Sequence, residues 1–595
     1  MMTGRDWIVL ILFTLISMAV GLFYTRVATS KGQEGFFTAN RNLSWWSLGI
    51  SNSATYQSGL GGFVMLIFLF GFSGNWLWWA QWIIWMPLVA IIWSKMWQRM
   101  RIVTTAELIS LRYGGKTAVF ARRAYALTMC LFSIITMAYI TGFFAKTIAP
   151  LVPMSMVSIL LLFGTVTLIY TLTGGLIGSV MVSVVQMIIM IAGSLVFFAI
   201  IIPQNGGWTS IISHVENIRH DALSLNPVST ITPPLTLIMF VIMGLFFAGS
   251  PTAGEGMTAQ RFMAAKNEKH AMGGQLFSTF ISLCLRIIPL VGLGIICITM
   301  FWSGDLVAKY GQAPQGFMLL KDPAFAWGEL IKASRLPSGF TGLLVATEVA
   351  AYMSTLSALI NWGSSFIVND FYKELKPGIN KKQEIVISRF TTLILFIIAS
   401  LIAILFVDDM VSWFLFINSV VVIFWLPLAY FRFFWPRFNV WGELAATILG
   451  LPLTVLFWFI LDFQHKPIWQ GTGMLFIIAL SVISLVTIIT PPESDETLKK
   501  FYMRCRPPAG WKKLRMKYPL LPGHDLSLRS QIIDCLLGII ACFGLAIATN
   551  AIFVLNWLIF GLGGSSALIF GGLLIRRSFK TRDSDFPGKV KNELI

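Results

Sequence analysis

Charged side chains are scarce in this sequence. Only 12% of its 595 residues are Asp, Glu, Lys or Arg, whereas 56% are hydrophobic, and an ordinary soluble domain has about 25% charged residues. A single soluble core stops growing at about 250–300 residues and does not accommodate this apolar content. Because apolar stretches recur along the whole chain, we expect the bilayer to solvate most of it. The composition excludes a soluble enzyme, a disulfide-rich scaffold and a disordered regulator, and predicts a polytopic membrane protein.

The sequence also lacks clustered metal ligands. Its six cysteines show no CxxC spacing, and all but Cys505 fall within apolar runs, so we interpret them as small buried hydrophobic residues. The five histidines all lie in polar connections. Without a histidine at membrane depth, bis-His haem ligation and catalysis by a membrane-embedded histidine have no candidate residue. We therefore expect that the protein is not an enzyme.

Apolar runs long enough to cross a bilayer as helices are abundant. The first run lacks a cleavage signal and is interpreted as a retained span. The fifteen runs cover approximately residues 7–24, 46–72, 76–94, 120–149, 154–173, 176–202, 235–254, 273–302, 338–367, 387–406, 411–431, 440–462, 470–490, 531–555 and 557–575. They predict an all-α polytopic membrane protein with about 15 transmembrane helices.

The formal net charge of +18 follows from the expected topology. With an odd number of spans and the N-terminus outside, most of the 44 Lys and Arg residues fall in cytoplasmic segments. The positive-inside rule therefore predicts a multi-pass protein of the plasma (inner) membrane with the N-terminus outside and the C-terminus cytoplasmic. Because orientation explains the charge, we expect no nucleic-acid partner.

Two of the apolar runs are internally broken. The second is interrupted by small and polar residues over 51–62, and the seventh ends in Ala248-Gly249-Ser250-Pro251-Thr252-Ala253-Gly254. Discontinuous helices at matching positions of two halves indicate an inverted-repeat transporter with its site near the midplane. The alternative is that small residues only allow close helix packing.

This pattern divides the chain into five parts. The predicted parts are an N-terminal extra helix and link (1–45), an inverted-repeat core (46–431, with repeats 46–202 and 235–431), two accessory helices (432–490), a basic cytoplasmic loop (491–530) and a C-terminal helix pair with its tail (531–595). We expect the loop to be a solvated connection, with contact to anionic lipid as the alternative. We interpret Asn75-Trp76-Leu77-Trp78-Trp79 as part of an interfacial aromatic belt.

One helix face carries oxygen ligands suited to a hard cation. Ala351, Ser354 and Thr355 are spaced i, i+3 and i+4, so they share a face of the ninth span. Together with carbonyls from the broken second span they would form a nest of oxygen atoms, which is how transporters coordinate sodium at half-helix ends. The alternative is that both hydroxyls bond back to carbonyls of their own helix.

The same residues belong to an ordered series of motifs that resembles the sodium:solute symporter family, which includes sodium/proline, sodium/sugar and sodium/sialic acid carriers. The series comprises Phe36-Phe37 through Arg41, Trp45-Trp46, Thr105-Ala106-Glu107, Arg112-Tyr113, Tyr170 to Gly175 with Gln186, Gln260-Arg261 through Lys266, Ala351 to Thr355, Asn361 to Ser365, and Asn369 to Tyr372. The resemblance covers the first twelve spans. It implies a 5+5 inverted-repeat core of the leucine-transporter type.

The resemblance also implies a sodium site. The family's main sodium ligands correspond to the carbonyls of Ala54, Gln57 and Ala351 and the hydroxyls of Ser354 and Thr355. At an additional sodium site of some members, many relatives have Thr-Asp and a serine pair, where this chain has Val182-Ser183 and Ser357-Ala358. Without that carboxylate we expect a single coupling ion.

Candidates for solute binding lie near the two breaks. Arg286 and Glu348 are ionisable residues within spans, where such residues are costly and usually functional. They could bind the solute or each other, and Glu348 could be neutralised by protonation. Tyr56, Gln57, Gln81 and Asn418 could supply neutral hydrogen bonds.

The sequence therefore predicts a symporter that uses Na⁺ as coupling ion to carry a small polar organic solute (a sugar, amino acid or organic acid) into the cell by alternating access. The expected partners are the lipid bilayer and the solute, with no obligate protein partner. Alternatives are a proton-coupled carrier of the same fold, with Glu348 carrying the proton, and a solute sensor that does not transport.

Overall fold

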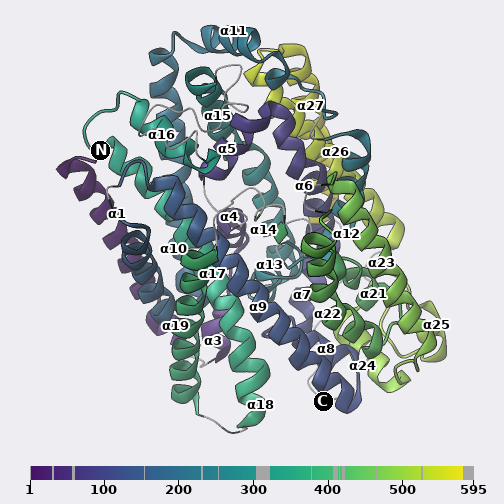
Figure 1. Ribbon diagram of the computed structural model, residues 1–595. Helices are drawn as coiled ribbons and strands as arrows, with labels where there is room; N and C mark the ends of the chain where they lie inside the picture. Colours follow the sequence, from purple (N-terminus) through teal and green to yellow (C-terminus); the bar gives the residue numbers. More distant parts are fainter. Residues whose placement is uncertain are drawn as a thin grey trace.

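The computed structural model forms a bundle of helices (Figure 1). It describes residues 2–29, 33–55, 60–152, 154–229, 232–251, 253–302, 322–376, 378, 380–406, 413, 416–417, 422–463, 466–523 and 527–580. Within these ranges the one pairing of extended backbone is an isolated parallel bridge between Leu43 and Ala265. The expected all-α fold is confirmed.

The first half of the chain contains both very short and very long helices. Its elements are α1 (Gly4–Phe23), α2 (Thr25–Thr29), α3 (Gln33–Thr38), η1 (Ala39–Arg41), α4 (Trp45–Thr55), α5 (Leu60–Phe70), η2 (Gly71–Asn75), α6 (Trp76–Leu88), η3 (Val89–Trp93), α7 (Ser94–Met100), α8 (Glu107–Arg112), α9 (Gly115–Ile148), α10 (Met156–Gln204), α11 (Trp208–Ile218) and η4 (His220–Leu223).

The second half begins with another run of short helices. Up to the end of the predicted core its elements are α12 (Pro234–Phe246), η5 (Phe247–Gly249), α13 (Met257–Met263), α14 (Glu268–Phe280), η6 (Ile281–Leu285), α15 (Ile287–Phe301), η8 (Pro323–Phe325), α16 (Ala326–Ala333), α17 (Phe340–Phe366), η9 (Ile367–Tyr372), α18 (Lys373–Leu375), α19 (Lys381–Phe406), η11 (Ile423–Trp425) and α21 (Leu428–Phe434). The remaining elements are α22 (Val440–Val455), η12 (Leu456–Ile460), α23 (Ile468–Ile489), α24 (Asp495–Cys505), α25 (Lys512–Lys517), α26 (Leu528–Phe553) and α27 (Trp557–Lys580).

The helix α10 is a hairpin rather than one straight rod. Gly175 interrupts it with φ 52° and ψ −150°, a conformation open mainly to glycine. Tyr170 donates to the carbonyl of Met353 at 2.8 Å, and Gln186 contacts the sulfur of the same Met353 at 3.9 Å. On a straight helix these two residues would be about 24 Å apart, so the chain reverses at Gly175.

The structure has eleven helices long and apolar enough to cross a membrane among the residues it describes, with two shorter apolar helices at Pro234–Gly249 and Ile423–Phe434. The predicted number of fifteen spans is therefore not confirmed. In two places a pair of predicted runs forms one helical stretch, at Leu60–Met100 and Val157–Gln204. Each of these stretches contains a glycine with positive φ, Gly71 at 58° and Gly175 at 52°. The chain folds back at these points, which is why two predicted runs are joined in one stretch.

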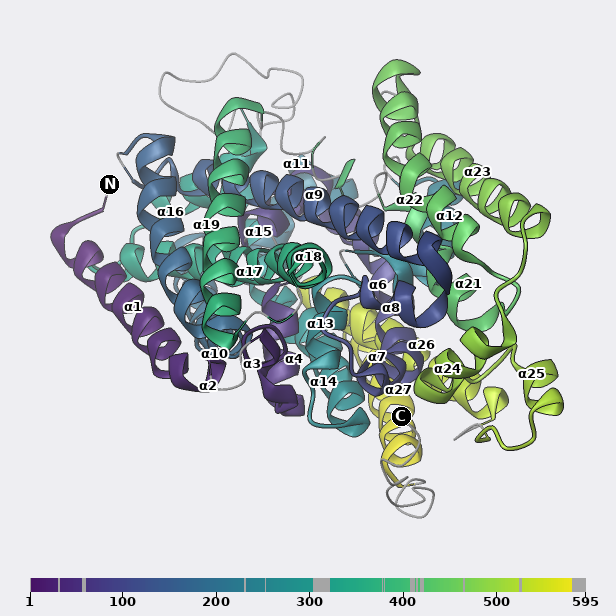
Figure 2. The same ribbon diagram turned by 90° about the horizontal axis from the view of Figure 1, so that it is seen from below.

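The helix α17 lies at the centre of the bundle. Seen from below, it is surrounded by α9, α10 and α19 (Figure 2), and its faces contact all three of these helices and α1. Almost every residue from Leu344 to Phe366 is buried. A central, fully buried helix with polar side chains is suited to carry a binding site, because lipid does not reach it.

Two expectations about the periphery are wrong. The side chains of Trp76, Trp78 and Trp79 are at most 5% exposed, so this cluster lies inside the protein and is not a lipid-facing belt. The described part of the segment 491–530 forms α24 and α25 and packs against the bundle. Its Trp511 is fully buried and donates to the carbonyl of Phe433 at 2.7 Å. Aromatic side chains in this basic segment explain why it folds onto the protein.

Candidate functional site

The break in the second apolar run lies between α4 and α5. The helix α4 ends at Thr55 and α5 begins at Leu60, and the last carbonyls and first N–H groups of two such helices lack partners within their own helices. Side chains supply these partners. The hydroxyl of Thr55 donates to the carbonyl of Asn52 at 3.0 Å, and Arg286 donates to that of Ser53 at 2.7 Å.

The carbonyl of Ala54 meets the hydroxyl face of α17. Ser354 Oγ lies 3.2 Å and Thr355 Oγ1 lies 3.5 Å from the Ala54 oxygen. Both hydroxyls also lie 3.0 Å from the carbonyl oxygen of Ala351. Four oxygen atoms from four buried residues thus gather at the end of α4. Carbonyls and hydroxyls with lone pairs that can turn inward are the ligands that hard cations take.

Glu348 lies at the other side of the break. Its Oε2 accepts hydrogen bonds from the backbone N–H groups of Leu60 at 2.9 Å and Gly61 at 3.4 Å. The side chain is fully buried in α17. A carboxylate at a helix N-terminus complements the positive end of the helix dipole. Glu348 therefore caps α5, and these two N–H groups show that the helix starts anew at Leu60.

Arg286 caps the C-terminal end of α4, as Glu348 caps the N-terminal end of α5. It follows the π-helical turn η6, where its own N–H bonds to the carbonyl of Ile281 five residues earlier at 3.1 Å. Such π-turns are frequent at functional sites because they redirect side chains. The guanidinium lies 5.3 Å from the ring centre of Phe63 and 5.8 Å from that of Trp82. A cation at the C-terminal end of α4 complements the negative end of its dipole.

The remaining predicted site residues are less central. Gln81 is buried in α6, where Gly244 of α12 approaches its backbone closely. Tyr56, Gln57 and Asn418 lie outside the described residues. Of the sequence-based candidates, Ala54, Ala351, Ser354, Thr355, Arg286 and Glu348 are brought together around the ends of α4 and α5.

The polar contacts that α4 makes with α14 and η6 were not identified from the sequence. Asn52 donates to Gln275 at 3.3 Å, and the hydroxyls of Ser53 and Ser282 are 2.9 Å apart. A signal was present, because Gln275, Ser278, Thr279 and Ser282 are spaced i, i+3, i+4 and i+7 and so form one polar face in an apolar run. These contacts position the carbonyl-bearing end of α4.

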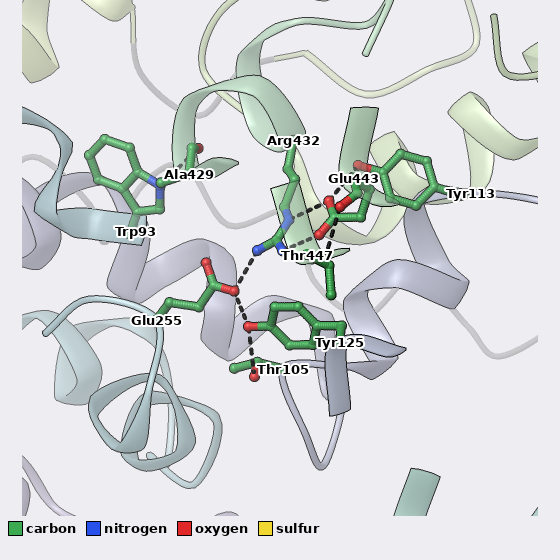
Figure 3. A network of polar contacts seen from close by, with 9 residues as sticks. All are labelled: Trp93, Thr105, Tyr113, Tyr125, Glu255, Ala429, Arg432, Glu443 and Thr447. Carbon is green, nitrogen blue, oxygen red and sulfur yellow. Dashed lines mark hydrogen bonds and ion pairs between the residues drawn. The ribbon is translucent and has the colours of Figure 1, made fainter. Parts of the chain in front are cut away.

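The second break is present at the predicted position. The helix α12 continues into η5, which ends at Gly249, and the next helix, α13, begins at Met257. Glu255 from this break binds Arg432 of α21 at 2.5 Å and accepts a hydrogen bond from Tyr125 of α9. Figure 3 shows Arg432 between the carboxylates of Glu255 and Glu443 of α22, with Tyr113 donating to Glu443 at 3.0 Å.

A further polar cluster fixes the far end of α17. Asp370 binds Arg122 of α9 at 2.6 Å and accepts from Thr104 at 2.8 Å. Asn369 donates to Glu107 of α8 at 2.5 Å. The motifs around Glu107 and Asp370, which are 263 positions apart in the sequence numbering, thus meet in space. They hold the helix that carries Ser354 and Thr355 to α8 and α9.

The chain belongs to the sodium:solute symporter family, since the model of this family matches residues 36–450. It is a membrane transporter that couples solute movement to Na⁺, and it is not an enzyme.

Similar curated proteins are cotransporters of the same kind. The sodium/myo-inositol cotransporter 2 of Bos taurus is 25% identical over 552 residues, with 83% of this chain and 78% of the relative covered. The same cotransporter of Homo sapiens is 25% identical, with 82% and 76% covered. A sodium/mannose cotransporter of Bos taurus is 23% identical, with 82% and 86% covered.

A solved structure has a similar fold. A Na⁺-coupled sialic acid symporter in a substrate-bound outward-open state superposes with a TM-score of 0.67 at 18% identity. The match covers 83% of this chain and 99% of the symporter. At this identity the likeness concerns the fold, so the ligands of this chain have to be inferred from its own residues.

Proposed function

We propose that this transporter carries a neutral polyhydroxylated solute, such as a hexose or a cyclic polyol, together with sodium. The observation that carries the proposal is the pairing of both ionisable residues at the first break with backbone groups. Arg286 binds the carbonyl end of α4 and Glu348 binds the N–H end of α5. Their charges are opposite, so they add no net charge that would favour an ionic solute.

The relatives support this class of solute. Two are named for myo-inositol and one for mannose, all of which are neutral polyols or hexoses. In addition, Glu348 occupies the N–H groups at the start of α5 that would otherwise attract an anion. A carboxylate-bearing solute would have to compete with this side chain for the same donors.

The proposed sodium site consists of the carbonyls of Ala54, Gln57 and Ala351 and the hydroxyls of Ser354 and Thr355. Its support is the mutual approach of the four described oxygen atoms within 3.5 Å. Because Ala54 belongs to α4 and Ala351, Ser354 and Thr355 belong to α17, bound sodium would hold the two helices together. Coupling then arises because the same helices flank the solute.

The proposed architecture is a core of two repeats with added segments at both ends. Residues 46–202 and 235–431 form two inverted repeats of five spans, and the segments 1–45, 432–490, 491–530 and 531–595 are additions to this core. The protein resides in the plasma membrane with its N-terminus outside and its C-terminus in the cytoplasm, as the distribution of Lys and Arg favours.

Uptake by the purified protein in proteoliposomes tests the proposed function. With an inward sodium gradient, we expect accumulation of radiolabelled myo-inositol or of a hexose, and no accumulation with a potassium gradient at any pH between 6 and 8. Excess sialate or other organic anions should not compete. Uptake driven by a pH gradient without sodium would instead support proton coupling through Glu348. Preferential uptake of anions would overturn the neutral-solute proposal.

A further inference from the structure

An apolar groove of about 810 Å³ opens between the repeat helices and the C-terminal helix pair. Its walls are α14 on one side and α26 and α27 on the other, with Trp45 of α4 and Pro87 of α6 at its edge. Of the residues that line it, only Lys269, His270 and Thr279 are polar. The groove is therefore suited to a hydrocarbon chain with a polar group at one end.

The groove has the length of one membrane leaflet. It runs along α14 from Lys269 to Phe280, which corresponds to about 17 Å at 1.5 Å per residue. The hydrocarbon core of a bilayer is about 30 Å thick, so this span is about half of it. A single acyl chain that starts at the interface would end near the membrane centre, as Phe280 does on this scale.

The polar end of the groove carries an excess of positive charge. Glu268 pairs with Arg99 at 2.6 Å, and Asp534 pairs with Arg577 at 2.8 Å. Lys269 lines the groove itself, Lys266 precedes it by three residues, and Arg576 directly follows the lining residue Ile575. Cations therefore outnumber carboxylates in this part of the chain. Basic clusters where helices meet the membrane surface attract anionic headgroups.

His270 offers a directed hydrogen-bond donor at the same end. Its Nδ1 accepts the backbone N–H of Trp45 at 3.0 Å. A neutral imidazole that accepts at Nδ1 carries its proton on Nε2. Because His270 lines the groove, that N–H can donate to a phosphate or ester oxygen, and the imidazole then links the start of α4 to a group bound in the groove.

We propose that the groove binds one anionic phospholipid, with an acyl chain along α14 and the headgroup at Lys269 and His270. The lipid lies between α14 and the α26–α27 pair. It also touches Trp45 at the start of α4, the helix that carries Ala54 at its other end. A lipid in this position fills a space that protein side chains leave open next to the transport core.

Two glycines of α27 provide a matched test. Neither Gly572 nor Gly561 has another atom within 4 Å of where a Cβ would lie. Only Gly572 lines the groove, and Gly561 is three turns away on the same helix. Leucine at either position is compatible with a lipid-exposed helix. Gly572→Leu would place a branched side chain in the groove, whereas Gly561→Leu leaves the groove unchanged.

Native mass spectrometry of the delipidated full-length protein measures the binding directly, with dioleoyl phosphatidylglycerol and dioleoyl phosphatidylcholine as probes. We expect the parent and Gly561→Leu to bind one phosphatidylglycerol at least tenfold more tightly than phosphatidylcholine. Gly572→Leu should lose this binding. In the double variant Lys269→Gln, His270→Ala, phosphatidylcholine should still bind but the preference for phosphatidylglycerol should disappear.

Three results would overturn the proposal. Equal binding of the two lipids to the parent would remove the headgroup argument. Unchanged binding in Gly572→Leu would place the lipid elsewhere. A dimer that dissociates in Gly572→Leu, with no lipid bound in the parent, would identify a second copy of the chain as the occupant. Melting curves of all variants verify that each one is folded.

Discussion

Arg286 and Glu348 have opposite charges and bind the two sides of the same helix break. A charge that complements a helix dipole contributes about 0.3–1 kcal/mol when exposed and up to about 2 kcal/mol when partly buried. Each residue also satisfies backbone groups that would otherwise be buried without partners, since Arg286 binds Ser53 and Glu348 binds Leu60 and Gly61. At this scale, the two buried charges stabilise the broken helix that forms the site.

The hydroxyls of α17 give the first prediction. Ser354→Ala and Thr355→Ala should each raise the sodium concentration for half-maximal uptake by about fivefold, equivalent to about 1 kcal/mol per lost ligand. Ser365→Ala is the control, because Ser365 is a buried serine of the same helix whose hydroxyl bonds to the carbonyl of Trp362. Sodium titrations of uptake measure the effect. If a variant with both Ser354→Ala and Thr355→Ala needs the same sodium concentration for half-maximal uptake as Ser365→Ala, the sodium site lies elsewhere.

The cap on α5 gives the second prediction. Glu348→Gln keeps an oxygen that can accept from Leu60 and Gly61, whereas Glu348→Ala leaves both N–H groups buried without a partner at about 1–3 kcal/mol each. The melting temperature of the purified protein should therefore fall clearly for Glu348→Ala and little for Glu348→Gln. Equal melting temperatures for both variants would mean that the carboxylate does not stabilise the helix start.

Among the elements, the two broken helices were predictable and their partners were not. The breaks follow from short runs of small and polar residues, and the i, i+3, i+4 spacing of Ala351, Ser354 and Thr355 places their backbone and side-chain oxygens on one face. Glu348, by contrast, binds a backbone N–H 288 residues earlier in the chain. Every residue except proline has a backbone N–H, so the identity of Leu60 does not indicate that a side chain binds it. A sequence pattern therefore cannot identify this contact.

The tryptophan cluster of α6 is a second feature whose surroundings the sequence did not predict. An aromatic cluster near a span end predicts an interfacial belt on average, but Trp78 packs against Phe63 at 4.7 Å between ring centres and is buried. Which face of α6 meets protein depends on where α26 lies. That arrangement is a property of the packed bundle and is not encoded in the local sequence of α6.

A double-mutant cycle gives the third prediction. Because Arg286 binds α4 and Glu348 binds α5, the losses in folding yield of Arg286→Met and Glu348→Ala should add in the double variant. A direct ion pair would instead let the double variant recover much of the yield lost by either single variant. Yield of monodisperse protein, read by fluorescence size-exclusion chromatography, distinguishes the two outcomes.

The buried cluster around Arg432 gives the fourth prediction. Removing one partner of a buried ion pair costs about 3–5 kcal/mol, so Arg432→Met should strongly lower the melting temperature. The exposed pair Lys500–Glu496, whose side chains are 70% and 74% exposed, is the control, and Lys500→Met should leave the melting temperature unchanged. If the two variants melt alike, the cluster does not stabilise the fold.

For the whole molecule, the charge moved per cycle gives the fifth prediction. With a neutral solute and one sodium, each cycle carries one positive charge, worth about 2.3 kcal/mol across 100 mV. The hydroxyl of Ser183 donates to the carbonyl of Ser179 at 2.7 Å, and residue 358 is an alanine without a ligand atom. We therefore expect a ratio of one sodium per solute from reversal potentials in proteoliposomes. A ratio of two would require a second ion site.

The Arg432 cluster also has a consequence for how the protein is made. Glu255 precedes Arg432 by 177 residues, and a ribosome adds about 5–20 residues per second. During synthesis about 9–35 s therefore pass between the addition of Glu255 and that of Arg432. Of Tyr125 and Arg432, the two residues that bond to Glu255 in the described structure, Tyr125 is the one already synthesised at that time. The second break, between η5 and α13, therefore lacks the cation that neutralises Glu255 until α21 has been synthesised.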